Sequence, residues 1–512
     1  MEDLLKLIEI AKKKGQRSIQ LVNQNFRKKE ISKDNLLYDG IISDKYTTDE
    51  VAAKDMFKAD PGNRNYRNAK GKLKQKLLNH LYFLDYEKEL YTCYGKNEYE
   101  CRHLLHQCQI LINEGANDIA IRQLPHLIKT AEEFEFIDIQ VEALSMLRNE
   151  YAILGKSTPF IETNTELIKV KKLQSSIHEC EELYYNTLVF LNKSVSAQNR
   201  ILAKVPETIA KIEEAAKKCQ SNRLDILAHK LMLENNQLNW DFEENIKICT
   251  KIEKKYLSKA NNEVMVDLDK KKIAFTKLFS FYCIEDAKNG NDYADKAYKL
   301  FKNGSTEWFG FIEYHFLLMM KGQNYKKAGD LFRKVRTNKN FNNLDESEKE
   351  RWQIYRAYLV FVNDTKLLRW GFDLEDFLKI VPHFPKDKQG YNISTLVIQF
   401  LFFLRSGDIE GVRKAVDDLQ NYNSVHLDKR NNYRNSIFIR LLSIITEKEF
   451  NYETVNEKGK TYYKKLVKTQ IPGDLYEDME VINYEILWDN VLHILKTNKI
   501  YVHYRFYNLE TV

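Results

Sequence analysis

The sequence predicts an all-α protein, in which an α-α superhelix of stacked helical hairpins follows a small helical N-terminal module. The 512 residues contain only 18 glycines and 7 prolines, far below the roughly 12% that these helix breakers together average in proteins. From about Asn97 onward, helical patterns of roughly fifteen to twenty residues alternate with short polar turns, which is typical of a helical repeat array. One helical hairpin, residues 305–336, has more apolar surface than it can bury alone.

In this hairpin, we expect a helix over 305–320, a tight turn at 322–324 and a second helix over 325–336. The second helix carries a single apolar stripe with helical spacing, made by Tyr325, Ala328, Phe332 and Val335. The first helix is apolar on nearly every side, with Phe309, Ile312, Phe316 and Met319 on one stripe and Trp308, Phe311 and Leu318 on another. Such a helix needs neighbours on two sides, so we expect stacked copies of the hairpin.

Gly322 followed by Tyr325, Ala328, Phe332 and Val335 resembles the turn and second helix of a tetratricopeptide repeat. The stretch from Gly407 to Leu419 resembles the same motif more closely in spacing. In the first stretch one extra residue separates the glycine from Tyr325, and His315 stands where the family has a small residue, which implies a wider helix crossing. The resemblance implies an α-solenoid with an extended binding groove.

The repeats are degenerate. Similar second-helix stripes occur at three other places: Ile121, Leu124, Ile128 and Ala131 after Gly115; Ile209, Ile212, Ala216 and Cys219 after Pro206; and Ala297 and Phe301 after Asn291-Asp292-Tyr293. The intervals are uneven, because Ala328 lies 31 residues after Ala297 and Val412 lies 84 residues after Ala328. A long helix over 345–362, with Trp352, Tyr355 and Leu359 aligned, fills one gap. Pro125 is expected to kink its helix, and residues 381–385 to form a loop.

We divide the chain into a basic helical module at 1–92, the tetratricopeptide-like solenoid at 93–470, and a C-terminal capping helix and tail at 471–512. The module is expected to hold helices at 2–14 and 32–42, a helix capped by Thr47 and Glu50 that ends at Phe57, and a long helix from Arg64 to about Tyr86. The buried face of the long helix is expected at Tyr66, Ala69, Leu73, Leu77, Leu81 and Leu84. The capping helix is expected to follow residues 471–474 and to bury Leu475, Met479, Ile482, Ile486 and Val491, with the tail 500–507 extended.

Charge is concentrated at the N-terminal end. Residues 1–92 hold 19 Lys/Arg and 14 Asp/Glu, which is +5 of the chain's total of +7. The segment 47–84, a short helix, a Pro-Gly turn and a basic long helix, resembles the second and third helices of winged-helix regulators. That resemblance implies nucleic-acid binding by Arg64, Arg67, Lys70, Lys72 and Lys74. No alternating strand pair that would form a wing follows at 87–97, and lysines beside an apolar stripe also simply solvate a helix.

No motif predicts catalysis, a cofactor or a metal site. Cys101, His103, His106 and Cys108 have metal-ligating side chains, but helical geometry turns the cysteines and the histidines in opposite directions. Gly459-Lys460-Thr461 lacks the earlier glycine of a phosphate-binding loop, since Thr454 stands there, and His178-Glu179-Cys180 diverges on a helix. Seven cysteines, an odd number, indicate reduced thiols in the cytoplasm. Neither a signal peptide nor a membrane span is expected.

The sequence therefore predicts an architecture more firmly than a function. Our first hypothesis is a non-enzymatic interaction scaffold or adaptor that holds a partner protein or peptide in the solenoid groove. The alternative is a regulator whose N-terminal module binds nucleic acid while the repeat array senses a partner.

Overall fold

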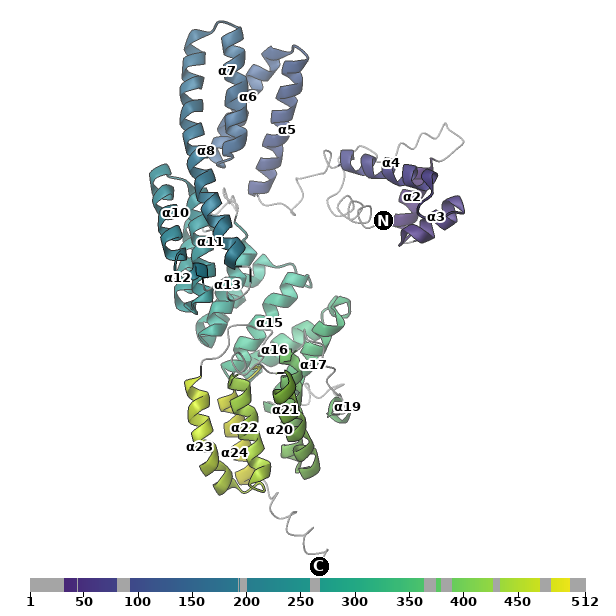
Figure 1. Cartoon of the computed structure of the whole chain (residues 1–512), viewed down its shortest axis with the longest axis vertical. Helices are drawn as coiled ribbons and strands as arrows, with labels where there is room; N and C mark the ends of the chain where they lie inside the picture. Colours follow the sequence, from purple (N-terminus) through teal and green to yellow (C-terminus); the bar gives the residue numbers. More distant parts are fainter. Residues whose placement is uncertain are drawn as a thin grey trace, which may run out of the picture. The chain divides into compact units, whose positions relative to one another are not determined.

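In the computed structural model the described residues are 32–43, 45–80, 93–191, 193, 200–257, 268–362, 374–378, 389–426, 433–469 and 480–497. All regular structure in these ranges is helical, and they contain no strand. The predicted all-α fold is confirmed (Figure 1). The predicted helix at 2–14, the loop at 381–385, the segment 471–479 and the tail at 500–507 lie outside the described residues.

Residue contacts divide the chain into two compact units. Unit 1 runs to Ala228 and includes Tyr256–Leu268, whereas unit 2 comprises His229–Lys255 and the chain from Asp269 onward. Helix α11 (Asn222–Leu238) contains the point of division. The predicted boundaries at 92 and 470 follow composition and remain predictions.

The first part of unit 1 is a three-helix module with a core of its own, made of α2 (Lys33–Ile42), α3 (Asp49–Phe57) and α4 (Arg64–His80). The predicted inner face of α4 is confirmed over the described residues, because Tyr66, Ala69, Leu73 and Leu77 are buried. The predicted capping residue of α3 is wrong by one position. Thr48, not Thr47, is the N-cap, and its side chain accepts a hydrogen bond from the backbone N–H of Val51.

The rest of unit 1 is an array in which each helix packs on the next one along the chain. Figure 1 shows the helices from α5 to α8 side by side, as their contacts require. Two predictions for this array are wrong. Helix α8 is 35 residues long, twice the predicted length, and the buried stripe of α6 is shifted to Ala120, Leu124, Leu127 and Ala131. Helix α6 continues through Pro125. The helices of this array are α5 (Cys93–Asn113), α6 (Asn117–Glu133), α7 (Ile137–Ile153), α8 (Ser157–Leu191) and α10 (Val205–Cys219).

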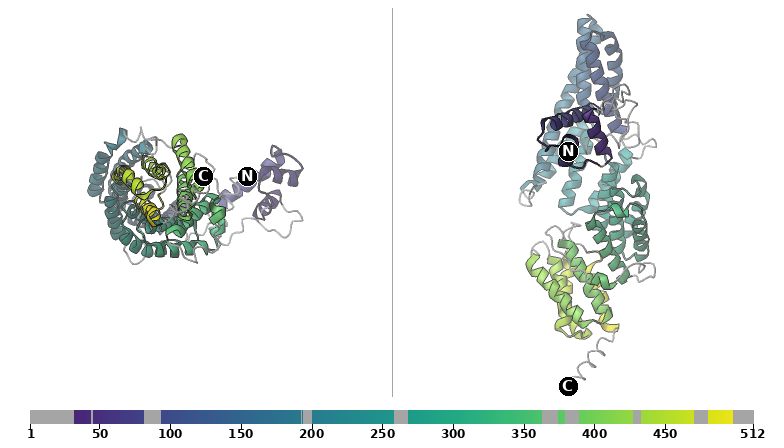
Figure 2. Two further views of the ribbon diagram at one scale, coloured as in Figure 1. Left: turned by 90° about the horizontal axis from the view of Figure 1, so that it is seen from below. Right: turned by 90° about the vertical axis from the view of Figure 1, so that its right-hand side faces the viewer.

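Unit 2 contains the predicted hairpin as α15 and α16 and the Gly407 stretch as the turn between α20 and α21. In Figure 2 the green and yellow helices form one bundle, and α24 returns to contact α20. The elements of unit 2 are α12 (Phe242–Ile252), the π-turn η2 (Glu253–Leu257, whose last two residues belong to unit 1), α13 (Lys270–Cys283), α14 (Ala287–Ala297), η3 (Tyr298–Leu300), α15 (Thr306–Lys321), α16 (Tyr325–Arg336), η4 (Phe341–Asn343), α17 (Glu346–Val362), α19 (Leu374–Leu378), α20 (Gln389–Ser406), α21 (Ile409–His426), α22 (Tyr433–Glu447), α23 (Tyr452–Lys468) and α24 (Tyr484–Thr497).

The predicted packing of the 305–336 hairpin is confirmed. Helix α15 is buried on two sides and contacts α13, α14 and α16. On α16 the stripe residues Ala328, Phe332 and Val335 are buried. In the Gly407 stretch Val412, Val416 and Leu419 are buried, and on α17 Trp352, Tyr355 and Leu359 are buried. Periodicity therefore identified the inner faces of these helices correctly.

One turn recurs at the helix junctions of both units. A residue with positive φ follows the helix, and the backbone N–H of the next residue bonds to a carbonyl five residues earlier, as in a Schellman cap. Glycine holds the positive-φ position at Gly115, Gly155 and Gly407, but Glu285 and Gln323 hold it elsewhere. The corresponding bonds are Ala116 to Leu111, Lys156 to Tyr151, Asp286 to Phe281, Asn324 to Met319 and Asp408 to Phe403.

The predicted position of the turn before Ala297, at residues 291–293, is wrong. The turn lies at Glu285 and Asp286, where the side chain of Asp286 caps α14, so Asn291 to Tyr293 fall in the middle of the helix. Within α14, Gly290 lies against α15: a Cβ added there would stand 2.3 Å from Cδ2 of Leu318. The small residue therefore serves close packing of two helices and does not mark a turn.

Gly322 has a similar role. Its φ is −75°, so it does not need glycine's conformational freedom, whereas the next residue, Gln323, has the positive φ of 55°. A Cβ on Gly322 would stand 2.2 Å from the Cβ of Ala287. The extra residue before Tyr325 follows from this arrangement, since the glycine packs against α14 and the turn is made by its neighbour.

Candidate functional site

The candidate functional site is a pocket of about 530 Å³ in unit 2. Its walls are the ends of helices from distant parts of the sequence. The α11–α12 turn, the last residues of α13, α15 and α23, and the beginnings of α22 and α24 all contribute. The lining residues are Trp240, Phe242, Tyr282, Cys283, Ile284, Glu285, Lys321, Arg434, Val467, Thr469, Asn483, Glu485 and Ile486.

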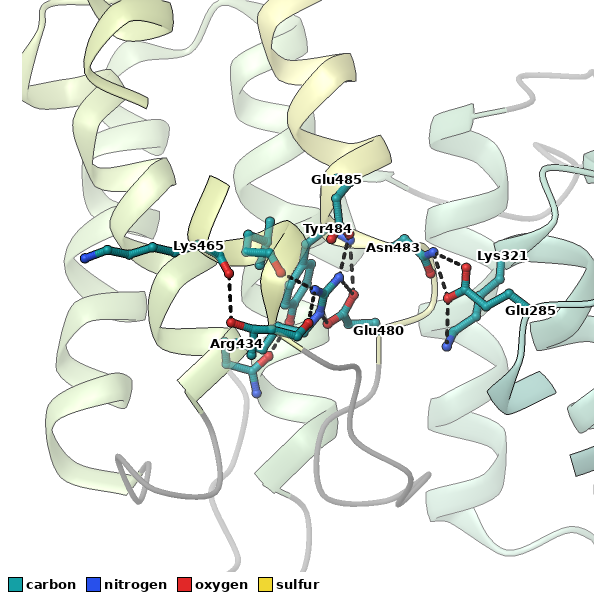
Figure 3. Close-up of polar contacts among 11 residues, drawn as sticks. Glu285, Lys321, Arg434, Lys465, Glu480, Asn483, Tyr484 and Glu485 are labelled. Carbon is teal, nitrogen blue, oxygen red and sulfur yellow. Dashed lines mark hydrogen bonds and ion pairs between the residues drawn. The ribbon is translucent and has the colours of Figure 1, made fainter. Parts of the chain in front are cut away.

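Arg434 is one of the lining residues of the pocket, and all its donors are in use (Figure 3). Its Nε and Nη2 donate to the two carboxylate oxygens of Glu480, and Nη2 also donates to Oε2 of Glu485 at 2.5 Å. Its Nη1 donates to the backbone carbonyls of Leu466 and Thr469 at 2.9 and 3.0 Å. A guanidinium has five N–H donors, so Arg434 fastens three helices together and has no donor left for a ligand.

Glu480 is the buried partner of this guanidinium. The residue is 2% exposed and also accepts a hydrogen bond from the backbone N–H of Tyr484 at 3.1 Å. Burial raises the pKa of Glu480, while the charges of Arg434 and Lys321 act against that rise. The pair holds the segment before α24 against α22 and α23.

A second buried cation, Lys321, lies at the end of α15. Its Nζ is 3.7 Å from Oε1 of Glu285 and 4.1 Å from the centre of the Tyr282 ring. Burial lowers the pKa of Lys321, but Tyr282, Glu285 and Glu480 outweigh it and leave the pKa above its ordinary value. Lys321 is therefore a charged ammonium group that a carboxylate and an aromatic face stabilise.

Glu285 joins the two sides of the pocket. Each of its carboxylate oxygens accepts a hydrogen bond from Nδ2 of Asn483 at 2.9 Å. Figure 3 shows Asn483 between Glu285 and the cluster of Arg434 and Glu480. Because Asn483 is the last residue before α24, this contact fixes the start of α24 beside the end of α13.

The apolar wall of the pocket includes Trp240, Phe242 and Tyr282, which belong to one row of aromatic rings. Trp240 makes an edge contact with Phe242 at 6.1 Å, and Phe242 makes one with Phe279 at 5.6 Å. Phe279 is stacked near Tyr282 at 6.3 Å. Trp240 stands at the outer end of this row with 40% of its surface exposed and a positive φ of 63°, a conformation that bulky residues rarely adopt.

The pocket also contains a thiol, that of Cys283. Burial raises the pKa of Cys283 to about 12, against the opposing effect of Lys321. The group is consequently protonated at neutral pH, and a protonated thiol is a poor nucleophile. The polar groups that the pocket presents to solvent include the carboxylates of Glu285 and Glu485, with side-chain exposures of 34% and 22%.

The basic residues singled out in the N-terminal module occupy different positions around α4. Arg64, Arg67 and Lys72 are exposed, and Lys70 and Lys74 are half-buried. Lys70 donates to both carboxylate oxygens of Asp49 at 2.9 and 3.0 Å, so it joins α4 to α3. The neighbouring Lys76 makes a corresponding bond to Asp34 of α2 at 2.5 Å. Of the predicted set, Lys70 therefore contributes to the packing of the module, while Arg64, Arg67 and Lys72 face solvent.

The expected geometry of the rejected motifs is confirmed. Cys101 and Cys108 are buried, while His106 is exposed and His103 is half-exposed and stacked on Tyr99. Cys180 is buried and His178 is exposed on the same helix. Gly459 lies inside α23, where a Cβ would stand 2.7 Å from the indole of Trp488, so it belongs to a helix contact and not to a phosphate-binding loop.

Sequence reasoning did not find the pocket. No motif marks it, because its residues lie singly at helix ends and meet only when the bundle forms. One available signal was a tryptophan followed by an N-capping residue, Trp240-Asp241, between two helical patterns. The position demands an αL conformation that tryptophan disfavours, which is unusual enough to attract notice.

Compared with known proteins, the chain matches no family model, no curated protein and no solved structure. None of the helices in the described part of the chain has both the length and the apolar character that a bilayer crossing requires.

Proposed function

We propose that the chain is a non-enzymatic interaction module with tetratricopeptide-like hairpins, and that it binds a segment of a partner protein in the pocket of unit 2. The observation that carries this proposal is the pocket itself, in which an exposed tryptophan, an aromatic wall and two partly exposed carboxylates converge from separate helix ends. Large aromatic anchors beside a few fixed polar groups are typical of interaction sites.

The surroundings of the pocket support a peptide more than a buried small molecule. Ile284 and Val467 line it with 36% and 55% of their surfaces exposed, so the apolar wall continues onto the open surface. A chain segment lying across this region covers both residues while one side chain enters the pocket. All seven cysteines are free thiols, which supports a reducing compartment such as the cytoplasm.

A peptide library displayed on phage tests the proposal. The full-length chain serves as bait, and a variant with Trp240→Ala and Glu485→Gln serves for counter-selection. We expect a shared motif to be enriched on the parent protein and to bind the double variant at least tenfold more weakly. Ile153→Ala is the matched control, since Ile153 is 74% exposed and lies in unit 1. Selection of the same peptides, or of none, by the parent and the double variant would refute the proposal.

A second candidate function rests on the outward side of α4. Arg64, Arg67 and Lys72 are exposed there, which supports a regulator whose N-terminal module contacts phosphates. The pairing of Lys70 with Asp49 and of Lys76 with Asp34 reduces the basic surface on which that function depends, and we rank it second.

A further inference from the structure

We propose that the pocket of unit 2 recognises a basic side chain, an arginine or a lysine, in the partner segment that it binds. This inference rests on the proposed function and specifies the chemistry of the ligand. Three independent features lead to it: the distribution of charge, an unused carboxylate oxygen, and the conformation and exposure of Trp240.

The positive charges of the pocket are buried, and two of its negative charges are partly exposed. The two cations are inside, since the side chains of Lys321 and Arg434 are only 1% and 3% exposed. The carboxylates of Glu285 and Glu485 are partly exposed in front of them. An incoming ligand therefore meets negative groups first, and the buried cations cannot reach an anionic ligand without leaving their partners.

The cluster also contains more acids than bases. Glu285, Glu480 and Glu485 face Lys321 and Arg434, so three carboxyl groups share two cations. A cationic ligand group supplies the missing positive charge. An anionic ligand would add a further negative charge to a partly desolvated site, where like charges repel strongly.

Glu485 retains capacity to accept a hydrogen bond. Its Oε2 accepts from Arg434, and among the described residues no donor contacts its other oxygen, Oε1. A carboxylate oxygen that lines a pocket and lacks a protein donor is a suitable acceptor for a guanidinium or ammonium group.

Trp240 supplies the aromatic face that completes such a site. Residue 240 in the α11–α12 turn has a positive φ, a position that glycine, glutamate or glutamine holds at the turns described above. Tryptophan is strained in this conformation, and local strain of this kind is a signature of functional positions. With 40% of its surface exposed at the pocket, its ring is available for a cation–π contact.

Within the chain itself, Lys321 already pairs with this aromatic wall. Its ammonium group lies over the ring of Tyr282 and near Glu285. In the proposed site, Trp240 and Glu485, which line the same pocket, play the parts that Tyr282 and Glu285 play for Lys321.

The test uses the full-length protein labelled with 5-fluorotryptophan. The ¹⁹F resonance of Trp240 is assigned by its loss in Trp240→Phe, and the other four tryptophans act as internal controls. The probes are the N-acetyl, N-methylamide derivatives of arginine, lysine, citrulline and glutamate. Citrulline matches arginine in shape and lacks its charge, so the comparison isolates the cation without any change to the protein.

We expect arginine and lysine to shift the Trp240 resonance saturably, and citrulline and glutamate to bind at least tenfold more weakly. Glu485→Gln should weaken arginine binding about tenfold, and Glu447→Gln, in an exposed ion pair of α22, should leave it unchanged. Equal binding of arginine and citrulline, or tighter binding of glutamate, would overturn the inference. If library selection yields a pocket-dependent motif without a basic residue, the proposed function stands and this inference fails. If neither a motif nor a probe shift is found, both fail.

Discussion

The carboxylate of Glu285 and the side-chain amide of Asn483 are hydrogen-bonded through both carboxylate oxygens at 2.9 Å, although 198 residues separate them in the chain. Glu285 has a positive φ of 57° at the turn after α13, and Asn483 immediately precedes α24. The contact links the hairpins in the middle of unit 2 to its last helix. It also places both residues in the wall of the pocket, so the stability of this link and the shape of the site depend on each other.

Replacing Arg434 by methionine should destabilise unit 2 strongly. The change leaves the buried carboxyl group of Glu480 without its guanidinium and removes one donor from each of the carbonyls of Leu466 and Thr469. Removing one partner of a buried ion pair typically costs about 3–5 kcal/mol. Urea denaturation followed by circular dichroism measures the change in unfolding free energy.

Arg440→Met is the matched control for this experiment, because Arg440 lies on the same helix and pairs with Glu447 at the surface, where both side chains are over 40% exposed. An exposed pair contributes roughly 0–1 kcal/mol. Equal losses for the two variants would show that the buried cluster does not stabilise the bundle. The double variant Arg434→Met with Glu480→Leu should recover much of the loss, since it removes both charges together.

Two glycines of the α15–α16 hairpin should respond in opposite directions to alanine. A Cβ on Gly322 would stand 2.2 Å from the Cβ of Ala287, so Gly322→Ala forces α14 and α15 apart; overpacking typically costs about 1–3 kcal/mol. A Cβ on Gly329, in the middle of α16, has no atom within 4 Å. Gly329→Ala should stabilise by up to about 1 kcal/mol, the difference in helix propensity. Thermal melts of the two variants and of the parent protein measure these effects. A shift in melting temperature in the same direction for both variants would contradict the packing described for Gly322.

The outcome for these hairpins indicates which parts of the fold are readable in the sequence. The helices of residues 305–336 and their inner faces were predictable because the residues that pack also set the periodicity, as Ala328 and Phe332 do. Turns were less predictable. A search for glycine finds Gly407 but misses Glu285 and Gln323, which adopt the same positive φ. The turn at Glu285 depends on the capping side chain of Asp286, and short-range composition did not distinguish it from the Asn-Asp-Tyr stretch that follows.

The candidate site was not predictable for a different reason. Its residues come from six helix ends, and the pairing of Glu285 with Asn483 or of Arg434 with Glu480 requires knowledge of which helices meet. The last helix illustrates the difficulty: the pattern predicted that it includes Ile482, but α24 begins at Tyr484, and the buried Ile482 belongs to the connection before it. Glu480 lies in that connection. Its carboxylate accepts a hydrogen bond from Arg434 through one oxygen, and its second oxygen accepts one from the backbone N–H of Tyr484.

His315 should make unit 2 less stable at mildly acidic pH. Its ring is fully buried on α15, where Nδ1 lies 2.9 Å from the hydroxyl of Tyr298 and Nε2 lies 3.1 Å from Oδ1 of Asn291. Burial lowers the pKa of His315 from 6.5 to about 4. The imidazole of His315 therefore takes up a proton near pH 6.5 in the unfolded chain, but only near pH 4 in the folded chain. Stability is lost as the pH falls through this window, by roughly 3 kcal/mol in total.

The contribution of His315 is isolated by comparing the parent protein with His315→Gln, in which no imidazole titrates. Unfolding free energies from urea titrations at several pH values between 4 and 7 provide the comparison. The substitution itself changes the unfolding free energy by an amount that does not depend on pH. The difference in unfolding free energy between the two proteins should therefore change by about 3 kcal/mol across the window, because the contributions of all other titrating groups are the same in both. A difference that does not vary with pH would mean that the ring of His315 accepts a proton within the fold.

The last prediction concerns the basic helix α4, whose residues divide into a structural and an exposed group. Lys70→Gln should destabilise the N-terminal module by about 1 kcal/mol, since it removes the ammonium that bridges to both oxygens of Asp49. Arg67→Gln should have an effect below about 0.5 kcal/mol, because Arg67 is exposed. Thermal melts of the two single variants measure this difference.

For nucleic-acid binding, filter-binding titrations of the full-length chain with duplex DNA at several salt concentrations are decisive. If Arg67, Lys70 and Lys74 contact phosphates, changing all three to glutamine should flatten the slope of log K against log salt by about 2.7, since each contact contributes about 0.9. We expect instead weak binding with little salt dependence, because Lys70 is held by Asp49 and the exposed Arg64 and Lys72 extend over a broad arc of α4 without forming a compact patch. Tight binding that falls steeply with salt, and that is lost in the triple variant, would reverse our ranking and establish the N-terminal module as the principal functional site.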